Sequence, residues 1–332
     1  MDVHRCRFLP YPSSAINAIA VPYQETNSQR NTATRAAIGR ANGNVEIWNP
    51  SNGHWLQESV MQGGQDRSID GLVWFSAPDR PRLFSIGGAS TITEWDIEAG
   101  RPRRHASGPH GEVWCIAVSP QHTLTGSNTP KLVVGTVDGE LAVYDIDANG
   151  LEFERKFAMT TTTKKKTNIV SLAFLSTSIV VAGCSDSFVR VCNIQRGMVQ
   201  HKISLGSDAA AAGSKDVIVW AVKVLPDGKR FVTGDSTGHV SLWTSKNYTM
   251  VQKIQAHEQD VLCLSVSLDG LQIFSGGMDR RVVLIRRSAQ NERFGKVFGR
   301  RYHEHDVKAM ASLETATISV VMTGGELCLC QR

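Results

Sequence analysis

The sequence predicts an all-β fold in which about seven short sheets are arranged around an axis, as the blades of a propeller. One pattern recurs: a glycine, a turn with Asp, Asn or Gly, an alternating apolar strand, and a final aromatic or apolar residue followed by a polar one. The residues that end these strands are Trp48, Trp95, Tyr144, Cys192, Trp243 and Ile285. Their spacing of roughly 42 to 51 residues is close to the ~40–45 residues of a four-stranded blade. The 332 residues therefore hold about seven blades and little else.

A second apolar segment precedes most copies of the pattern. It predicts a strand in the inner part of each blade. Near-continuous apolar runs occupy residues 113–118, 169–174, 217–222 and 261–266. Runs of this length are typical of strands that are buried on both faces, as between stacked blades. We therefore expect one domain over residues 1–332, with blades that end near residues 49, 96, 145, 193, 244 and 286 and at the C-terminus.

The seventh blade is the least complete in the sequence. It opens near His303 and stops at residues 324–330, where more strand is expected. In propellers a strand from the N-terminus often completes the last blade and so removes an open edge. Residues 3–8, with apolar Val3 and Phe8 among polar neighbours, are the predicted closing strand.

Composition places the chain among globular proteins, with 41% hydrophobic and 20% charged residues. The first residues lack the apolar core of a secretory signal, and no apolar run approaches the ~18 residues of a membrane span. The seven cysteines follow no regular spacing, which indicates reduced, buried thiols in an intracellular protein.

The layout of turns and strands resembles the WD-repeat family. The sixth repeat is the most complete copy, with His257, Val261, Asp269, Gly270, Ser275, Gly276, Asp279 and Val282 at the family's positions. The only literal Trp-Asp pair is Trp95-Asp96. The resemblance implies a binding scaffold in which buried histidine, hydroxyl and carboxylate side chains form structural hydrogen bonds. The candidates for this structural role are His110, Asp138, Asp186, His257, Ser275 and Asp279.

The resemblance is closer to one branch, the cirhin family of WD-repeat proteins. The segments that carry it are residues 3–8, 43–49, 82–87, 111–117 and 217–222, in register from about residue 3 to residue 310. Members of that family are the WD-repeat subunit of the t-UTP (UTP-A) subcomplex of the small-subunit processome. The resemblance implies a nucleolar scaffold for early pre-rRNA processing and 18S rRNA maturation. Implied partners are the other t-UTP subunits, small-subunit processome proteins and the 5′ external transcribed spacer of pre-rRNA, with neither a membrane nor a small-molecule substrate. Family members carry two tandem propellers, of which this chain covers the first.

Positive charge is gathered in three stretches, within a formal net charge of +5. The candidate RNA- or partner-binding residues are Arg101, Arg103, Arg104, Lys164, Lys165, Lys166, Arg280, Arg281, Arg286, Arg287, Arg293, Lys296, Arg300 and Arg301. One interpretation is an ordinary solvated surface. The other is contact with RNA phosphates, in which each neutralised phosphate adds salt-dependent affinity.

Catalytic and cofactor motifs are missing from the sequence. It contains no Gly-x-Ser-x-Gly elbow, and its Gly-Gly pairs lack the spacing of a phosphate-binding loop. The sequence therefore predicts no enzymatic activity, no cofactor and no metal site. Two alternatives stay open. One is a general WD-repeat adaptor, such as a ubiquitin-ligase receptor or a signalling scaffold. The other is a propeller enzyme with acidic or histidine residues at the central channel.

Overall fold

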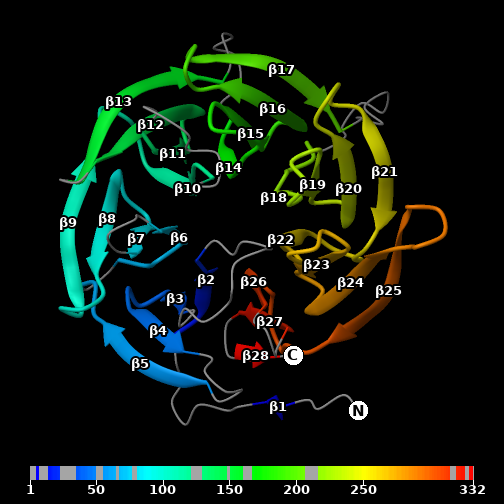
Figure 1. The fold of residues 1–332 in the computed structure, drawn as a ribbon, viewed down its shortest axis with the longest axis horizontal. Helices are drawn as coiled ribbons and strands as arrows, with labels where there is room; N and C mark the ends of the chain where they lie inside the picture. The colour runs from blue at the N-terminus through cyan, green and yellow to red at the C-terminus, as the bar shows by residue number, and fades with distance from the viewer. Residues whose placement is uncertain are drawn as a thin grey trace.

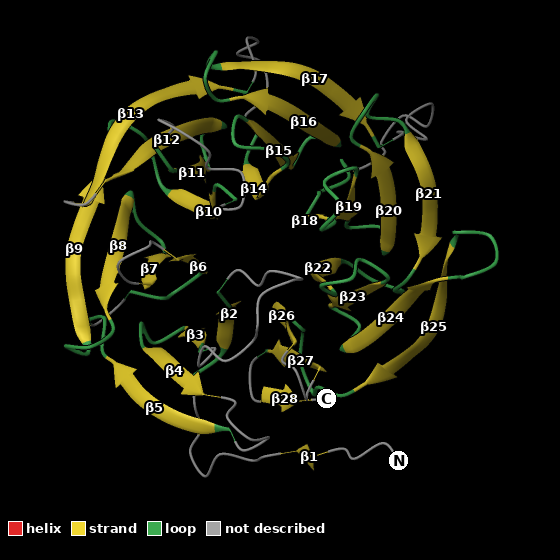
Figure 2. Cartoon of the chain, viewed as in Figure 1, coloured by secondary structure: helices red, strands yellow, loops and turns green. Residues whose placement is uncertain are grey.

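The computed structural model describes twelve ranges of the chain: residues 5–6, 14–22, 35–49, 55–64, 67–76, 81–120, 129–147, 150–159, 167–205, 216–314, 319–325 and 329–331. Their elements are strands joined by turns, and no helix occurs among them (Figure 2). Within these residues no helix is therefore long and apolar enough to cross a membrane.

The strands form seven four-stranded sheets, of which six use four consecutive strands. The first is β2 (Ile16–Ala20), β3 (Ala36–Arg40), β4 (Val45–Asn49) and β5 (Leu56–Met61). The second is β6 (Gly71–Ser76), β7 (Pro81–Ile86), β8 (Thr91–Asp96) and β9 (Arg101–Ser107). The third is β10 (Val113–Val118), β11 (Lys131–Thr136), β12 (Glu140–Asp147) and β13 (Gly150–Ala158).

The second half of the chain repeats this order. The fourth sheet is β14 (Ile169–Phe174), β15 (Ile179–Cys184), β16 (Phe188–Asn193) and β17 (Met198–Ser204). The fifth is β18 (Ala221–Val224), β19 (Arg230–Gly234), β20 (His239–Thr244) and β21 (Met250–Gln255). The sixth is β22 (Val261–Val266), β23 (Gln272–Gly277), β24 (Arg281–Arg287) and β25 (Phe294–Arg301). The remaining sheet joins β26 (Ala309–Glu314), β27 (Ser319–Gly324) and β28 (Leu329–Gln331) to β1 (Arg5–Cys6).

The sheets stand around a common axis as the blades of a propeller, and we number them 1 to 7 in the order just given (Figure 1). In blades 1 to 6 the first strand lies nearest the axis and the fourth forms the outer edge. Apolar clusters join neighbouring blades; one of them unites Val45 and Ile47 of blade 1 with Leu83 and Trp95 of blade 2. Each sheet therefore buries its apolar faces only against its neighbours, as the near-continuous apolar runs predict.

The two ends of the chain meet in blade 7. Strand β1 pairs antiparallel with β28, so that Arg5 lies opposite Gln331 and Cys6 opposite Cys330. The predicted closing segment thus supplies a strand at the predicted place, while Val3 and Phe8 themselves lie outside the described residues. The pairing covers one edge of β28 that would otherwise be open.

Deleting residues 1–10 should lower the melting temperature and promote aggregation, because β28 then presents an unpaired edge. At an unfolding entropy of about 2.1 cal/mol/K per residue, each kcal/mol lost lowers the melting temperature of a chain of this size by about 1–2 °C. Circular dichroism melts with simultaneous light scattering would measure both effects. Deleting residues 1–4 alone is the matched control, since it keeps Arg5 and Cys6. An unchanged curve for the longer deletion would exclude a closing role for β1.

The predicted blade ends need one correction. Residues 49, 96, 193 and 244 are the last residues of β4, β8, β16 and β20, which are the third strands of their sheets. A fourth strand follows in each blade, so the blades extend further than the repeat pattern indicates. The repeat pattern does not reveal the fourth strand because that strand is little buried. In blade 5, for example, β21 is exposed or half-buried along its whole length and therefore shows no apolar pattern.

The inner strand of blade 5 also differs from the prediction. It spans Ala221–Val224 instead of residues 217–222. Residues 217–219 bond to blade 4 instead of pairing within the sheet of blade 5. The Val217 carbonyl accepts from the Ser187 N–H, and the Val219 N–H donates to the carbonyl of Cys184, the last residue of β15. The apolar run therefore continues into a connection that joins blades 4 and 5.

Candidate binding surfaces

The basic residues predicted to bind RNA or a partner lie on two separate blades. Arg101, Arg103 and Arg104 belong to β9, the outer strand of blade 2, whereas the second group lies on and around β24 and β25 of blade 6. These two outer edges are on opposite sides of the ring (Figure 1). Lys164, Lys165 and Lys166 lie outside the described residues. The described candidates therefore form two surfaces instead of one patch.

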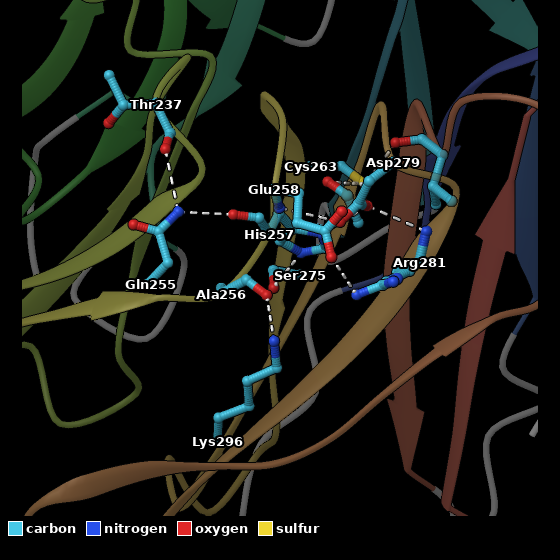
Figure 3. Close-up of polar contacts among 12 residues, drawn as sticks. Thr237, Gln255, Ala256, His257, Glu258, Cys263, Ser275, Asp279, Arg281 and Lys296 are labelled. Atoms are coloured by element: carbon cyan, nitrogen blue, oxygen red, sulfur yellow. Dashed lines mark hydrogen bonds and ion pairs between the residues drawn. The ribbon is translucent and has the colours of Figure 1, made fainter.

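Three of the blade 6 candidates are held by contacts within the protein. Arg281 pairs with Glu258 at 2.9 Å, and Arg287 pairs with Glu292 at 2.7 Å. The Lys296 ammonium donates to the Ala256 carbonyl at 2.6 Å, which ties the outer strand of blade 6 to the connection that follows blade 5 (Figure 3). These side chains are therefore less available to an outside ligand.

The other blade 6 arginines are exposed and make no ion pair among the described residues. They are Arg280, Arg286, Arg293, Arg300 and Arg301. Arg300 lies opposite Val282 in the β24–β25 pair, and Arg286 follows Val282 at an even spacing along β24. Residues at these positions share one face of the sheet. Val282 packs against Val307 and Val321 of blade 7, so the face that carries Arg286 and Arg300 is turned toward blade 7. Arg301 lies opposite Arg281 and therefore on the other face of the same sheet. We call the five residues together, on both faces and in the turns of blade 6, the blade 6 arginine surface.

Blade 6 also contains the hydrogen-bonded set of the sixth repeat. His257 Nε2 is 2.8 Å from Ser275 Oγ, and His257 Nδ1 is 2.8 Å from Asp279 Oδ1 (Figure 3). A carboxylate only accepts, so a neutral ring donates from Nδ1 to Asp279 and accepts the Ser275 hydroxyl proton at Nε2. Asp279 also accepts from the backbone N–H groups of Glu258 (3.2 Å) and Arg281 (3.1 Å). The set therefore ties the connection before blade 6 to the turn before β24.

Burial controls the protonation of this set. Desolvation lowers the pKa of His257 below its ordinary value and outweighs the opposing effect of Asp279. Burial alone would raise the pKa of the Asp279 carboxyl, but the hydrogen bonds from His257 and from the backbone N–H groups of Arg281 and Glu258 hold that pKa below its usual range. Ser275, His257 and Asp279 are the residue types of a hydrolytic triad. However, Ser275 has no exposed surface, so its hydroxyl cannot reach a substrate, and the arrangement serves the fold.

The other structural candidates take different partners. His110 Nε2 contacts the Tyr144 hydroxyl and His110 Nδ1 lies 2.9 Å from the Gly111 carbonyl, while Asp138 lies against Gly111. A Cβ atom at Gly111 would approach Asp138 Oδ2 to 2.0 Å, so a side chain at this position would displace the Asp138 carboxylate. In blade 3 the histidine thus contacts a tyrosine hydroxyl, whereas His257 in blade 6 contacts a serine hydroxyl.

In blade 4 the carboxylate meets an arginine. Asp186 accepts two hydrogen bonds from Arg190, at 2.8 and 2.5 Å, and one from Thr167 at 3.2 Å. Burial would raise the pKa of Asp186, yet the Arg190 hydrogen bonds and charge keep that pKa lowered. In blade 7 His303 Nε2 lies 2.8 Å from Thr323 Oγ1, and burial lowers the pKa of His303 to about 4.

The sequence analysis missed two buried ion pairs. Arg40 pairs with Glu46 at 2.7 Å, and Arg82 pairs with Glu94 at 2.9 Å. Both glutamates stand inside apolar strands, one or two residues before the tryptophan that ends the repeat. A charged residue at such a position is rarely buried without a partner, and this was the signal in the sequence.

Across the described ranges no group of three His, Cys, Asp or Glu side chains is placed to hold a metal ion.

Three stretches of the chain, residues 100–145, 211–244 and 248–285, match the model of the family described as WD domain, G-beta repeat. The fold is an all-β WD-repeat propeller. The matched stretches cover β9 to β12, β18 to β20 and β21 to β24.

Relatives similar over nearly the whole chain carry one name, U3 small nucleolar RNA-associated protein 4. The chain is 37% identical to the Schizosaccharomyces pombe protein over 328 residues and 33% identical to the Saccharomyces cerevisiae protein over 336 residues; each match covers 98% of this chain. The Homo sapiens homolog is 29% identical over 322 residues. That name is an alternative to cirhin. The chain spans 41–44% of the length of these relatives.

Proposed function

We propose that this WD-repeat propeller is a non-catalytic scaffold in ribosome biogenesis. It acts in early pre-rRNA processing and 18S rRNA maturation in the nucleolus, as part of the t-UTP subcomplex of the small-subunit processome. The observation that carries the proposal is the similarity, over 98% of the chain, to proteins named for their association with the U3 small nucleolar RNA. The buried position of Ser275 and the absence of catalytic motifs in the sequence support a role in binding instead of catalysis.

The blade 6 arginine surface is the proposed contact with the 5′ external transcribed spacer of pre-rRNA. Its five guanidinium groups are exposed and lack acidic partners among the described side chains, so they can meet phosphates without first breaking an ion pair. The arginines of β9 form a second basic edge on the opposite side of the ring (Figure 1).

Changing Arg286, Arg293 and Arg300 to Glu should weaken binding of a 5′ external transcribed spacer fragment and reduce its salt dependence. Each lost phosphate contact removes about 0.7 from the slope of log K against log salt for single-stranded RNA, so the slope should fall by about 2. Fluorescence anisotropy titrations at salt concentrations from about 50 to about 200 mM would measure this slope, because phosphate contacts change the affinity strongly over that range.

The control changes Lys229, Lys246 and Lys253 to Glu, which alters the net charge equally but on blade 5. A separate variant changes Arg101, Arg103 and Arg104. Equal loss in the blade 5 control would indicate a general charge effect and would refute the assignment to blade 6. Loss only in the blade 2 variant would move the RNA contact to β9.

The choice between this scaffold and a general WD-repeat adaptor depends on the partners. Affinity purification of the full chain should recover small-subunit processome proteins. Recovery of ubiquitin-ligase or signalling subunits without rRNA-assembly factors would favour the adaptor.

A further inference from the structure

The buried histidines of blades 6 and 7 occupy equivalent slots. In blade 6 the slot adjoins Ser275, which lies opposite Val283 on β24 and contacts the His257 ring at 2.8 Å. In blade 7 the Thr323 hydroxyl contacts the His303 ring at the same distance. Both histidines are buried, so the slot holds a flat heterocyclic ring against a hydroxyl group.

Blade 2 has the hydroxyl of this slot, but none of the described histidines contacts it. Ser85 pairs in register with Thr93, two residues before the end of the repeat at Trp95, and Ser275 pairs at the corresponding place before Ile285. The connection between β5 and β6, which leads into blade 2, contains no histidine in its sequence. The ring that fills the slot in blades 6 and 7 is therefore missing from the described part of blade 2.

A pocket lies at this slot in blade 2. It encloses about 380 Å³ of empty space, which includes solvent at its open mouth. Its walls come from the connection between β5 and β6, from β7 and β8, and from the outer strand β9 (Figure 1). The apolar walls include the Ile69 side chain and the rings of Trp95 and Pro102. Apolar walls with a few polar groups are typical of a site for a small ring-shaped ligand.

The deepest polar group of the pocket is the Ser85 hydroxyl. Ser85 is only 2% exposed, and its oxygen accepts the Trp95 indole N–H at 2.8 Å. In blade 6 the Ser275 hydroxyl proton is donated to His257, whereas the Ser85 proton has no such acceptor among the described residues. A ring nitrogen or a carbonyl oxygen of a ligand can accept this proton.

Thr93 and His105 form the outer side of the pocket. Thr93 Oγ1 lies 3.0 Å from His105 Nδ1, and the His105 side chain is exposed on β9. An exposed imidazole ring beside a pocket can stack on a nucleobase, and the threonine hydroxyl can bond to the edge of that base.

The charge around the mouth of the pocket favours RNA over a protein ligand. Strand β9 carries Arg101, Arg103 and Arg104 beside His105 and contains no acidic residue. Arg67, which also lines the pocket, is exposed and makes no ion pair among the described residues. These guanidinium groups can bind the phosphates on either side of a base that enters the pocket.

We propose that this pocket binds one unpaired nucleobase of a single-stranded RNA. The edge of the base bonds to Ser85 and Thr93, and the neighbouring phosphates pair with Arg67 and the arginines of β9. A base inside a duplex cannot enter such a pocket, since its edge is paired and its faces are stacked. The inference rests on the RNA-binding role proposed above. It adds a site that contacts a base, separate from the phosphate contacts of blade 6.

The test compares single-stranded RNA with an abasic chain of the same length and charge. The probes are oligomers of A, C, G and U of about ten nucleotides and a fully abasic oligomer of equal length, a size typical of single-strand binding sites. At least one base-containing oligomer should bind the unchanged chain about tenfold more tightly than the abasic oligomer does, as expected for one stacked base. This ratio should fall to about twofold or less in Thr93→Val, which keeps the shape of the side chain, and in His105→Ala.

Thr249→Val and His201→Ala are the matched controls, because both residues are exposed on other blades. Both variants should keep the ratio of the unchanged chain. Crosslinking with 4-thiouridine in the uridine oligomer should attach the RNA to β8 or β9 of blade 2, and melting curves would show that the variants are folded.

Two results would overturn the base pocket: equal binding of all oligomers and the abasic chain, or a ratio that persists in both pocket variants. The first result would limit RNA contact to phosphates. The salt dependence measured for the blade 6 variants does not involve bases, so it separates failure of this pocket from failure of the RNA role. Binding of neither the oligomers nor the abasic chain would refute both.

Discussion

Replacing Arg82 with alanine should lower the free energy of unfolding by about 3–5 kcal/mol, the usual cost of leaving one member of a buried ion pair alone. Arg82 donates to both Glu94 oxygens, at 2.9 and 3.0 Å, and the two side chains are only 6% and 5% exposed. Its guanidinium also donates to the carbonyls of Asp147 (2.5 Å) and Gly150 (3.2 Å). The change therefore leaves the Glu94 carboxylate buried without its partner. It also removes the hydrogen bonds between blades 2 and 3.

Urea denaturation would measure the loss from a lower midpoint at an unchanged slope. Arg281→Ala is the matched control, because its pair with Glu258 is 40% and 73% exposed and is expected to contribute about 0–1 kcal/mol. Replacing Arg82 and Glu94 together with Met and Leu should restore most of the stability, since no charge is then left unpaired. A loss below about 1 kcal/mol in Arg82→Ala would mean that the pair does not stabilise the joint between the blades.

The Arg82–Glu94 pair also shows what cannot be predicted from the sequence. The repeat period follows from local alternation and turn chemistry, so the propeller and its inner strands can be predicted from Gly135, Val143 and their counterparts. The partner of Glu94 lies on another strand, and the carbonyls of Asp147 and Gly150 belong to the next blade. Such contacts depend on how blades stack, which no local pattern encodes.

The binding surfaces show the same limit. The arginines near residue 286 are visible in the sequence as charge, but their division into paired and unpaired groups depends on Glu258 and Glu292.

Stability should fall as the pH drops from about 6.5 toward 4, mainly through His303. Burial holds its pKa at about 4 in the folded chain, against an ordinary value near 6.5 in the unfolded chain. The folded state thus binds fewer protons in this window, so its stabilising contribution is complete above pH 6.5 and is lost as the pH falls through 4. At about 1.4 kcal/mol per pKa unit, the loss is roughly 3 kcal/mol. The lowered pKa of His257 acts in the same direction.

Urea midpoints measured from about pH 7 to 4.5 on His303→Gln would test this, since that range lies above the titration of most carboxylates. The variant should be less stable at neutral pH, because the bond of His303 to Thr323 is altered, but its stability should change less with pH than that of the unchanged chain. His201→Gln, at an exposed histidine of β17, should keep the full pH dependence. Parallel curves for His303→Gln and the unchanged chain would show that His303 does not govern the acid response. The buried carboxylates Asp186 and Asp279 could not replace it, because their lowered pKa values place their effect at more acidic pH.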